Sequence, residues 1–354
     1  MKQPTILLLI ALCIVAQNNL RAQAPGAVQQ VESVRLREQN ELSAKSYNEG
    51  DSVPEISPDE GSDAGPQSVL RIKQRKTYFE AMADAQYFYT DNMFLGDDFK
   101  KSADVLVSTV QIALAPTPYD LAGGKFAPRV GYRHQWFDYG LISRDKVDVL
   151  DLGNLNTGKV RLNEFDFNAQ TFFTDMRWSR DKWTAWLGFD FTRLLSTSSY
   201  NQFYEEYVPR WGLQRSFTVN DNAAFSLGYM GDYRFTSVDT IPPVRDDDAN
   251  DRTDHSLFAA WTQTLCKHAL VQPYYRFTYT RFIVPTMTLR PSDFRLVSND
   301  RNDYLHSLGI ALYYFITPNI SARVFVSYDL RESDAAQDYA KLDAGGGVNF
   351  TLKF

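Results

Sequence analysis

The sequence predicts an all-β protein, a closed antiparallel transmembrane β-barrel of about twelve strands, with roughly 10 to 14 strands compatible with the pattern. A disordered N-terminal extension precedes the barrel. Three observations predict this fold class: long runs of alternating apolar and polar residues, links that alternate between short and long, and a last strand that ends in phenylalanine.

Residues 225–235 show the alternation most clearly. Phe225, Leu227 and Tyr229 share one parity, and Ser226 and Gly228 share the other. Neighbouring side chains of a strand point to opposite faces, so one face is apolar and the other polar. The runs last roughly 12 to 16 residues, longer than most globular strands and long enough to cross a bilayer at a tilt. The same pattern recurs in residues 126–138, 270–284 and 320–331.

The links between the runs supply the topology. The predicted strands are 77–92, 102–114, 125–138, 160–176, 182–193, 203–219, 223–236, 254–266, 270–284, 303–316, 320–332 and 339–354. Tight links, such as 220–222 and 317–319, alternate with long polar links at 139–159, 237–253 and 285–302. Barrels of the outer membrane have short periplasmic turns and longer outer loops. The link 116–124 is long for a periplasmic turn and does not fit this alternation.

Composition narrows the class further. Aromatic residues make up 14% of the chain, although the mean hydropathy is only -0.36. A polar average with many aromatic residues is typical of a barrel with a wet interior and an apolar outer wall. The net charge of -6 argues against nucleic acid as a partner. We expect no cofactor and no metal site, and Cys266 alone can form neither an internal disulfide nor a cysteine cluster.

The sequence divides into three parts, of which the first two precede the barrel. Lys2, the apolar run 6–15 and the Ala22-Gln23-Ala24 segment predict a signal peptide over residues 1–24. Residues 25–75 have the composition of a disordered periplasmic extension. A short amphipathic helix near 27–46 that binds a periplasmic partner is the alternative. Residues 76–354 form the barrel, and the expected location is the cell outer membrane.

The last strand predicts how the barrel is assembled. Phe350, Leu352 and the terminal Phe354 lie on one apolar face of this strand. This face resembles the C-terminal signal that the barrel assembly machinery reads on outer-membrane proteins of Gram-negative bacteria. The resemblance implies that machinery as a partner, together with outer-membrane lipid and lipopolysaccharide.

A second resemblance concerns the end of the first strand. The segment Tyr89-Thr90-Asp91-Asn92-Met93-Phe94 is similar to one found at the same place in a family of β-barrel porins, some of them linked to exopolysaccharide loci. The resemblance implies a porin-like role but does not identify a substrate. Its local interpretation is that Asp-Asn makes a turn where the strand leaves the membrane.

The predicted lumen face carries the functional hypothesis. The pore-lining candidates are the charged residues of that face: Arg129, Arg133, Glu164, Asp166, Asp190, Glu206, Arg210, Asp232, Arg276, Arg323, Asp329 and Arg331. They favour a porin-like channel for small polar solutes or for the export of saccharide. We expect Glu164 and Asp166 to lie beside Arg129 and Arg133 and to offset their charge.

Two other hypotheses stay open. The charges could pair across the lumen of a non-conducting barrel that serves a structural or docking role in an envelope or exopolysaccharide system. An outer-membrane hydrolase is the third hypothesis, although no His-x-Ser pair is present. We therefore expect no enzyme and no catalytic residues.

Deleting Phe354, or changing it to a charged residue, should lower insertion because the apolar face ends at that residue. The mutant protein should accumulate in the periplasm, as measured by membrane fractionation and by heat-modifiable mobility in gels. Unchanged membrane levels and mobility would count against the assembly signal.

Overall fold

The computed structural model describes residues 24–29, 31, 77–96, 100–144, 146–151, 156–238, 247–290, 295–335 and 338–354. The chain divides into two units, of which one is residues 24–76 and the other contains the barrel. In the first unit, residues 24–29 and 31 are helical. Almost all of residues 1–24 and 25–75 lie outside the described residues, so the signal peptide and the extension stay predictions.

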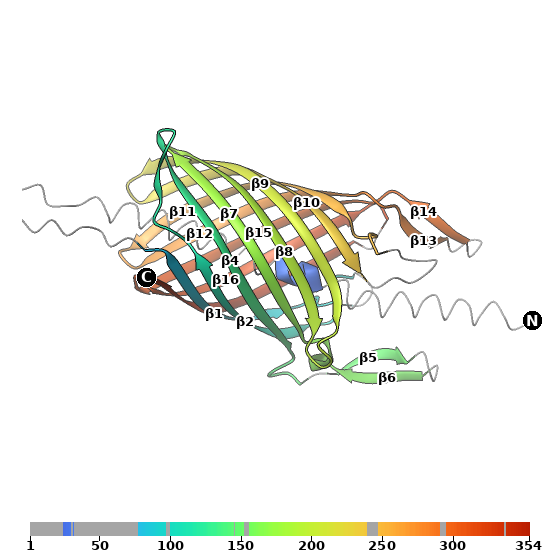
Figure 1. The fold of residues 1–354 in the computed structure, drawn as a ribbon. Helices are drawn as coiled ribbons and strands as arrows, with labels where there is room; N and C mark the ends of the chain where they lie inside the picture. The colour runs from blue at the N-terminus through green and yellow to red at the C-terminus, as the bar shows by residue number, and fades with distance from the viewer. Residues whose placement is uncertain are drawn as a thin grey trace, which may run out of the picture. The chain divides into compact units, whose positions relative to one another are not determined.

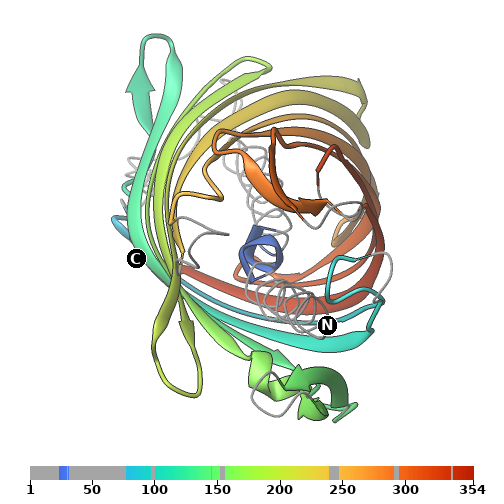
Figure 2. The ribbon, with the colours of Figure 1, turned by 90° about the vertical axis from the view of Figure 1, so that its right-hand side faces the viewer.

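Among the described residues, twelve antiparallel strands form a closed wall (Figures 1 and 2). They are β1 (Phe79–Thr90), β2 (Ala103–Leu114), β4 (Gly124–Tyr139), β7 (Phe167–Arg180), β8 (Trp183–Ser196), β9 (Gln202–Asn220), β10 (Ala223–Val238), β11 (Arg252–Cys266), β12 (Ala269–Phe282), β15 (Asn302–Thr317), β16 (Ile320–Ser333) and β17 (Tyr339–Lys353). Each strand pairs with the next along the chain, and β1 pairs with β17. The predicted fold class and the order of strands are confirmed.

Several short elements lie outside this wall. Two hairpins, β5 (Lys146–Asp151) with β6 (Asn156–Arg161) and β13 (Thr286–Arg290) with β14 (Arg295–Asn299), form separate two-stranded sheets at the end of the barrel where the long links lie (Figure 1). A short 3-10 helix, η1 (Leu162–Phe165), follows β6.

The structure corrects one predicted strand. Residues 160–176 were expected to be continuous, but β7 begins at Phe167, and residues 160 and 161 belong to β6. The physical reason is that β6 pairs with β5 and not with the wall, so its residues alternate without facing the lumen.

The anomalous link 116–124 forms an extra strand. Here β3 (Tyr119–Leu121) pairs with the start of β4. Ala122 and Gly123, with φ of 52° and 73°, make the tight turn between the two strands. The link is therefore a hairpin and not a long loop, which explains why its length did not fit a plain turn.

The outer face of the wall is apolar. Ile112, Leu308 and Val324 are exposed by 55%, 60% and 56%, whereas residues of the opposite parity in the same strands are mostly buried. Apolar side chains left uncovered in this number are stable only against an apolar environment, as in the lipid-facing band of a transmembrane barrel.

The wall closes where the first strand meets the last. Residues from Glu80 to Thr90 pair in register with residues from Lys353 to Asp343. Phe354 extends this pairing, because its carbonyl accepts hydrogen bonds from the amides of Tyr78 and Phe79, both at 2.9 Å. The rings of Phe79 and Phe354 are stacked with centroids 5.9 Å apart.

A buried arginine spans this seam on the inner face. Arg323 of β16 donates to both carboxylate oxygens of Asp84 on β1, at 2.7 and 2.9 Å, and to Gln86 at 2.7 Å. The side chain crosses β17 at Gly347, where an added Cβ would lie 3.1 Å from the guanidinium. The side chains of Arg323 and Asp84 are only 1% and 5% exposed. A glycine at this position thus leaves room for a contact between strands that are not neighbours.

Arg323→Ala should destabilise the barrel by roughly 3–5 kcal/mol, because it leaves the Asp84 carboxylate buried without its partner. Denaturant unfolding in detergent or lipid would measure this. The double variant Arg323→Ala/Asp84→Ala is the matched control and should be less destabilised than the sum of the single variants. Strict additivity would show that the two side chains do not interact.

Single cysteines should report the orientation of the barrel. In a Cys266→Ser background, Asp248→Cys in the long link between β10 and β11 should react with an impermeant thiol reagent on intact cells. Asp221→Cys in the tight β9–β10 turn should react only after the outer membrane is opened, because short turns face the periplasm. The reverse pattern would invert the topology.

Candidate functional site on the inner wall

Most of the predicted lumen residues lie on the inward parity of barrel strands, opposite the exposed apolar side chains. This group comprises Arg129, Arg133, Asp190, Glu206, Arg210, Asp232, Arg276, Arg323, Asp329 and Arg331. The backbone alternation of a strand places them on the inside.

Glu164 and Asp166 were predicted wrongly to face the lumen. Glu164 lies in η1 with an exposed side chain, and Asp166 follows that helix. The Asp166 carboxylate accepts a 2.8 Å hydrogen bond from the backbone amide of Tyr139, and so ties the link to the end of β4. Burial of this carboxylate raises its pKa to about 7. The error arose because the predicted strand 160–176 was too long: β7 begins only at Phe167, so both residues precede the wall.

Other carboxylates take the place predicted for these two. Arg129 donates to Glu80 of β1 at 2.6 Å and lies 3.9 Å from Asp175 of β7. Arg210 of β9 contacts Asp175 closely and Asp190 of β8 at 3.2 Å. We call these five residues the inner ionic cluster. Sequence reasoning missed Glu80 because the residues that face outward next to it in β1 are Phe79 and the small alanines Ala81 and Ala83, while Met82 and Phe88 put apolar side chains on the inner face, so the contrast between the faces is weak.

An aromatic ring stabilises the arginines of β4. The guanidinium carbons of Arg129 and Arg133 lie 5.6 and 5.5 Å from the centroid of Phe173 on β7. Cations are attracted to the face of an aromatic ring at this distance. The two arginines are therefore held against the wall, one on each side of the ring along the strand.

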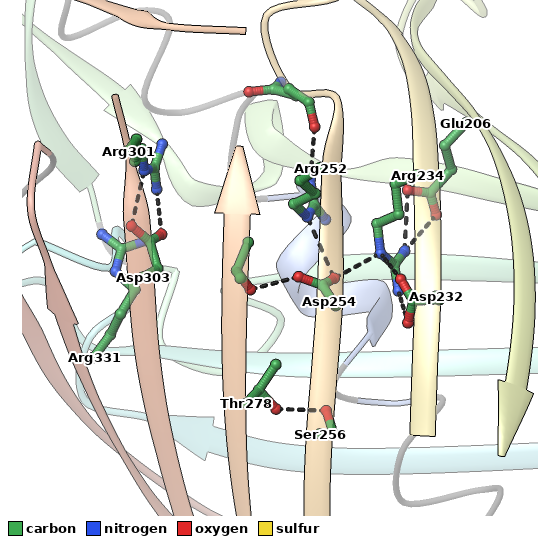
Figure 3. A network of polar contacts seen from close by, with 12 residues as sticks. Glu206, Asp232, Arg234, Arg252, Asp254, Ser256, Thr278, Arg301, Asp303 and Arg331 are labelled. Carbon is green, nitrogen blue, oxygen red and sulfur yellow. Dashed lines mark hydrogen bonds and ion pairs between the residues drawn. The ribbon is translucent and has the colours of Figure 1, made fainter. Parts of the chain in front are cut away.

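A second set of charges lies near the end of the barrel that carries the long links (Figure 3). Arg234 of β10 contacts three carboxylates, those of Asp232 and Asp254 at 3.0 Å and that of Glu206 at 3.2 Å. Arg252, the first residue of β11, lies 3.4 Å from Asp254. These side chains join β9, β10 and β11.

This set of charges continues at the start of β15 and on β16. Arg301 donates to both oxygens of Asp303, at 2.9 and 2.6 Å, and Arg331 of β16 lies 3.7 Å from Asp303 (Figure 3). The Arg301 guanidinium stacks on Phe282 at 4.0 Å and that of Arg331 lies 4.5 Å from the Tyr339 ring. We call these charged residues, together with the two rings that contact them, the outer ionic arc: Glu206, Asp232, Arg234, Arg252, Asp254, Phe282, Arg301, Asp303, Arg331 and Tyr339. Beside the arc, Lys341 pairs with Asp329 and Asp343 at 3.5 and 3.0 Å.

The ion pairs named above share one geometric property. Each joins residues of the same strand, of neighbouring strands, or of strands next but one, as for Arg129 with Glu80 and Arg323 with Asp84. They therefore run along the wall and neutralise it locally. A barrel sealed by these side chains would instead need pairs between strands on opposite sides.

At the same end of the barrel, β2, β4, β7 and β8 carry apolar side chains on their inner faces. Phe137 of β4 and Phe167 of β7 are stacked with centroids 4.4 Å apart. Val107 of β2 and Leu194 of β8 also face inward and are fully buried. Sequence reasoning expected a polar interior throughout and missed this patch. The inner wall at this end is therefore ionic over β9–β17 and apolar over β2–β8.

The histidines do not support the hydrolase hypothesis. His134, His255 and His306 lie on the outward parity, and each accepts or donates a hydrogen bond at Nδ1 with a tyrosine hydroxyl, at 3.0, 2.7 and 2.7 Å. His268 lies in a turn and contacts the carbonyl of Phe315. Such pairs suit the interfacial zone, where a side chain needs both an apolar body and a polar partner.

Among the residues that the structure describes, no group of three or more His, Cys, Asp or Glu is placed to hold a metal ion. Within them, too, the helices fall short of the length and apolarity needed to span a bilayer.

Comparison with known proteins gives structural likeness only. No family model matches the chain, and no curated protein matches its sequence. An outer-membrane channel from Pseudomonas putida F1 is 8% identical over 82% of this chain and 99% of its own, with a TM-score of 0.45. The β domain of the Bordetella autotransporter Brka (14%, 78% and 100%, 0.39) and an anion-selective porin from Comamonas acidovorans (9%, 78% and 100%, 0.37) are similar too. Likeness at this level carries no argument about function, which has to come from the side chains.

Proposed function

We propose that this chain is a porin-like channel of the outer membrane that passes small polar solutes. The observation that carries the proposal is that the inward charges pair along the wall, as in Arg129–Glu80 and Arg234–Asp254. Charges held on the wall can act on a solute in the passage. Insertion by the barrel assembly machinery, and contact with outer-membrane lipid and lipopolysaccharide, are part of this proposal.

The number of strands suits a narrow passage. Barrels of about eight strands are filled by side chains, and those of about 16 to 18 leave a wide aqueous channel. Twelve strands lie between these cases, so the inward side chains set the selectivity. Fixed charges in a narrow pore act at close range on a permeating solute.

The arrangement of charge favours dipolar solutes. Guanidinium and carboxylate groups alternate along the wall, so the field beside it changes direction from place to place and has no single sign. Sugars and zwitterions align with such a field, whereas a strongly charged ion meets both attraction and repulsion. This is why we favour small polar solutes over simple salts. Export of a saccharide is the narrower form of the same proposal.

Two double variants, each removing charge of one sign, should shift ion selectivity in opposite directions. Arg129→Gln/Arg210→Gln removes positive charge from the inner ionic cluster and should favour cations. Glu80→Gln/Asp175→Asn removes negative charge and should favour anions. Reversal potentials in a planar bilayer under a salt gradient measure the shift, and liposome swelling measures sugar entry.

Glu164→Gln is the matched control, because that carboxylate lies on an exposed link and not on the wall. It should leave selectivity unchanged. Heat-modifiable mobility should first show that each variant is folded. If the folded wild type neither conducts nor admits sugars, the channel proposal fails, and a non-conducting docking barrel becomes the better explanation.

A further inference from the structure

We infer that the outer ionic arc contains a recognition site for carboxylate-bearing solutes, built on Arg301 and supported by Arg252 and Arg331. This inference rests on the proposed channel and narrows its small polar solutes to those that carry a carboxylate. The arc lies where a solute would meet the wall first, if the long links face outward. Arg252 begins β11, Arg301 directly precedes β15, and Arg331 lies two residues before the end of β16.

The cationic groups are more exposed than the carboxylates that they bind. The Arg301 and Arg331 side chains are 17% and 18% exposed, whereas Asp303 between them is 8% exposed. Arg234 at 12% and Glu206 at 8% show the same order. A solute at the arc therefore finds the guanidinium donors more accessible than the carboxylate acceptors.

The carboxylates of the arc are already engaged as acceptors. Asp303 accepts two hydrogen bonds from Arg301 and one from the Ser333 hydroxyl at 2.5 Å. Asp254 accepts from Arg234, Arg252 and the Thr280 hydroxyl. A carboxylate offers about four acceptor sites. Asp303 and Asp254 thus have few acceptor sites left, which disfavours a cation as the ligand at these two carboxylates.

Arg301 keeps one edge of its guanidinium directed away from Asp303. It contacts that carboxylate through Nε and Nη2, which lie on one edge of the planar group. The other edge, formed by Nη1 and Nη2, has the parallel N–H geometry that binds a second carboxylate with two hydrogen bonds. A neutral hydroxyl can use only one of these donors at a time, so a carboxylate should bind more strongly.

Aromatic rings fix the orientation of these guanidiniums before a ligand arrives. The Phe282 ring lies 4.0 Å from the Arg301 guanidinium and 6.0 Å from that of Arg252, and Tyr339 lies 4.5 Å from that of Arg331. Stacking restricts the rotamers of arginine, and a restricted side chain loses less entropy on binding. The rings also offer an apolar surface to the carbon skeleton of the ligand, as in most small-molecule sites.

Glucuronate and glucose are suitable probes, because they differ only in the carboxylate. Isothermal titration of the full chain in detergent should show binding of glucuronate well below the concentration at which glucose binds. Arg301→Gln should weaken glucuronate binding about tenfold, the effect expected from losing a charged hydrogen-bonded pair, and should leave glucose unchanged. In a planar bilayer, glucuronate should reduce the wild-type current more than glucose does.

Arg180→Gln is the matched control, because this exposed arginine ends β7 at a tight turn and belongs to neither ionic cluster; it should leave glucuronate affinity unchanged. Phe282→Leu keeps the charge, removes the stacking, and should weaken binding to a smaller degree. Equal binding of the two sugars, or unchanged affinity in Arg301→Gln, would overturn the inference even if the channel conducts. Glucuronate binding that depends on Arg301 in a barrel that does not conduct would support the site while the channel proposal fails.

Discussion

The pairing of β1 with β17 is the constraint on which the rest of the structure depends. In a bilayer an unpaired backbone amide or carbonyl costs several kcal/mol, so a sheet can cross it only when no edge remains. Residues separated by almost the whole length of the barrel sequence must therefore meet in one register. Arg323 makes that register specific, because its contact with Asp84 requires Gly347 to lie between them. A slip of β1 by one residue would turn the Asp84 side chain to the other face and break this contact.

The same logic extends to the charges of the inner wall. Buried ion pairs add little net stability, since desolvation offsets much of their attraction, but a missing partner is costly. Arg210 links β9 to β8 and β7, and Arg234 links β10 to β9 and β11. Each such pair penalises alternative registers of the strands that it joins. The wall charges can thus specify the barrel and also act on solutes.

Alternation in the sequence predicted the twelve strands because the two faces of the wall lie in different solvents. It worked best where the contrast between the faces was strong, as in β10 and β16, and failed where the pattern ran on beyond the wall. Residues 160–166 precede β7, so Glu164 and Asp166 were wrongly predicted to lie within the lumen. The partners of the arginines could not be predicted, because they depend on register between strands. The apolar patch around Phe137 was missed because composition averages the two sides of the lumen.

The hairpins β5–β6 and β13–β14 have a consequence for how such a protein can change over time. Each pairs only with itself, so insertions or deletions there break no hydrogen bond of the wall. Longer loops add only a small entropic cost. The surface that phages, antibodies or competing cells would meet can therefore diversify by whole segments. The wall has no such freedom, since each of its strands is held on both sides, and it should change mainly through exchanges of single side chains.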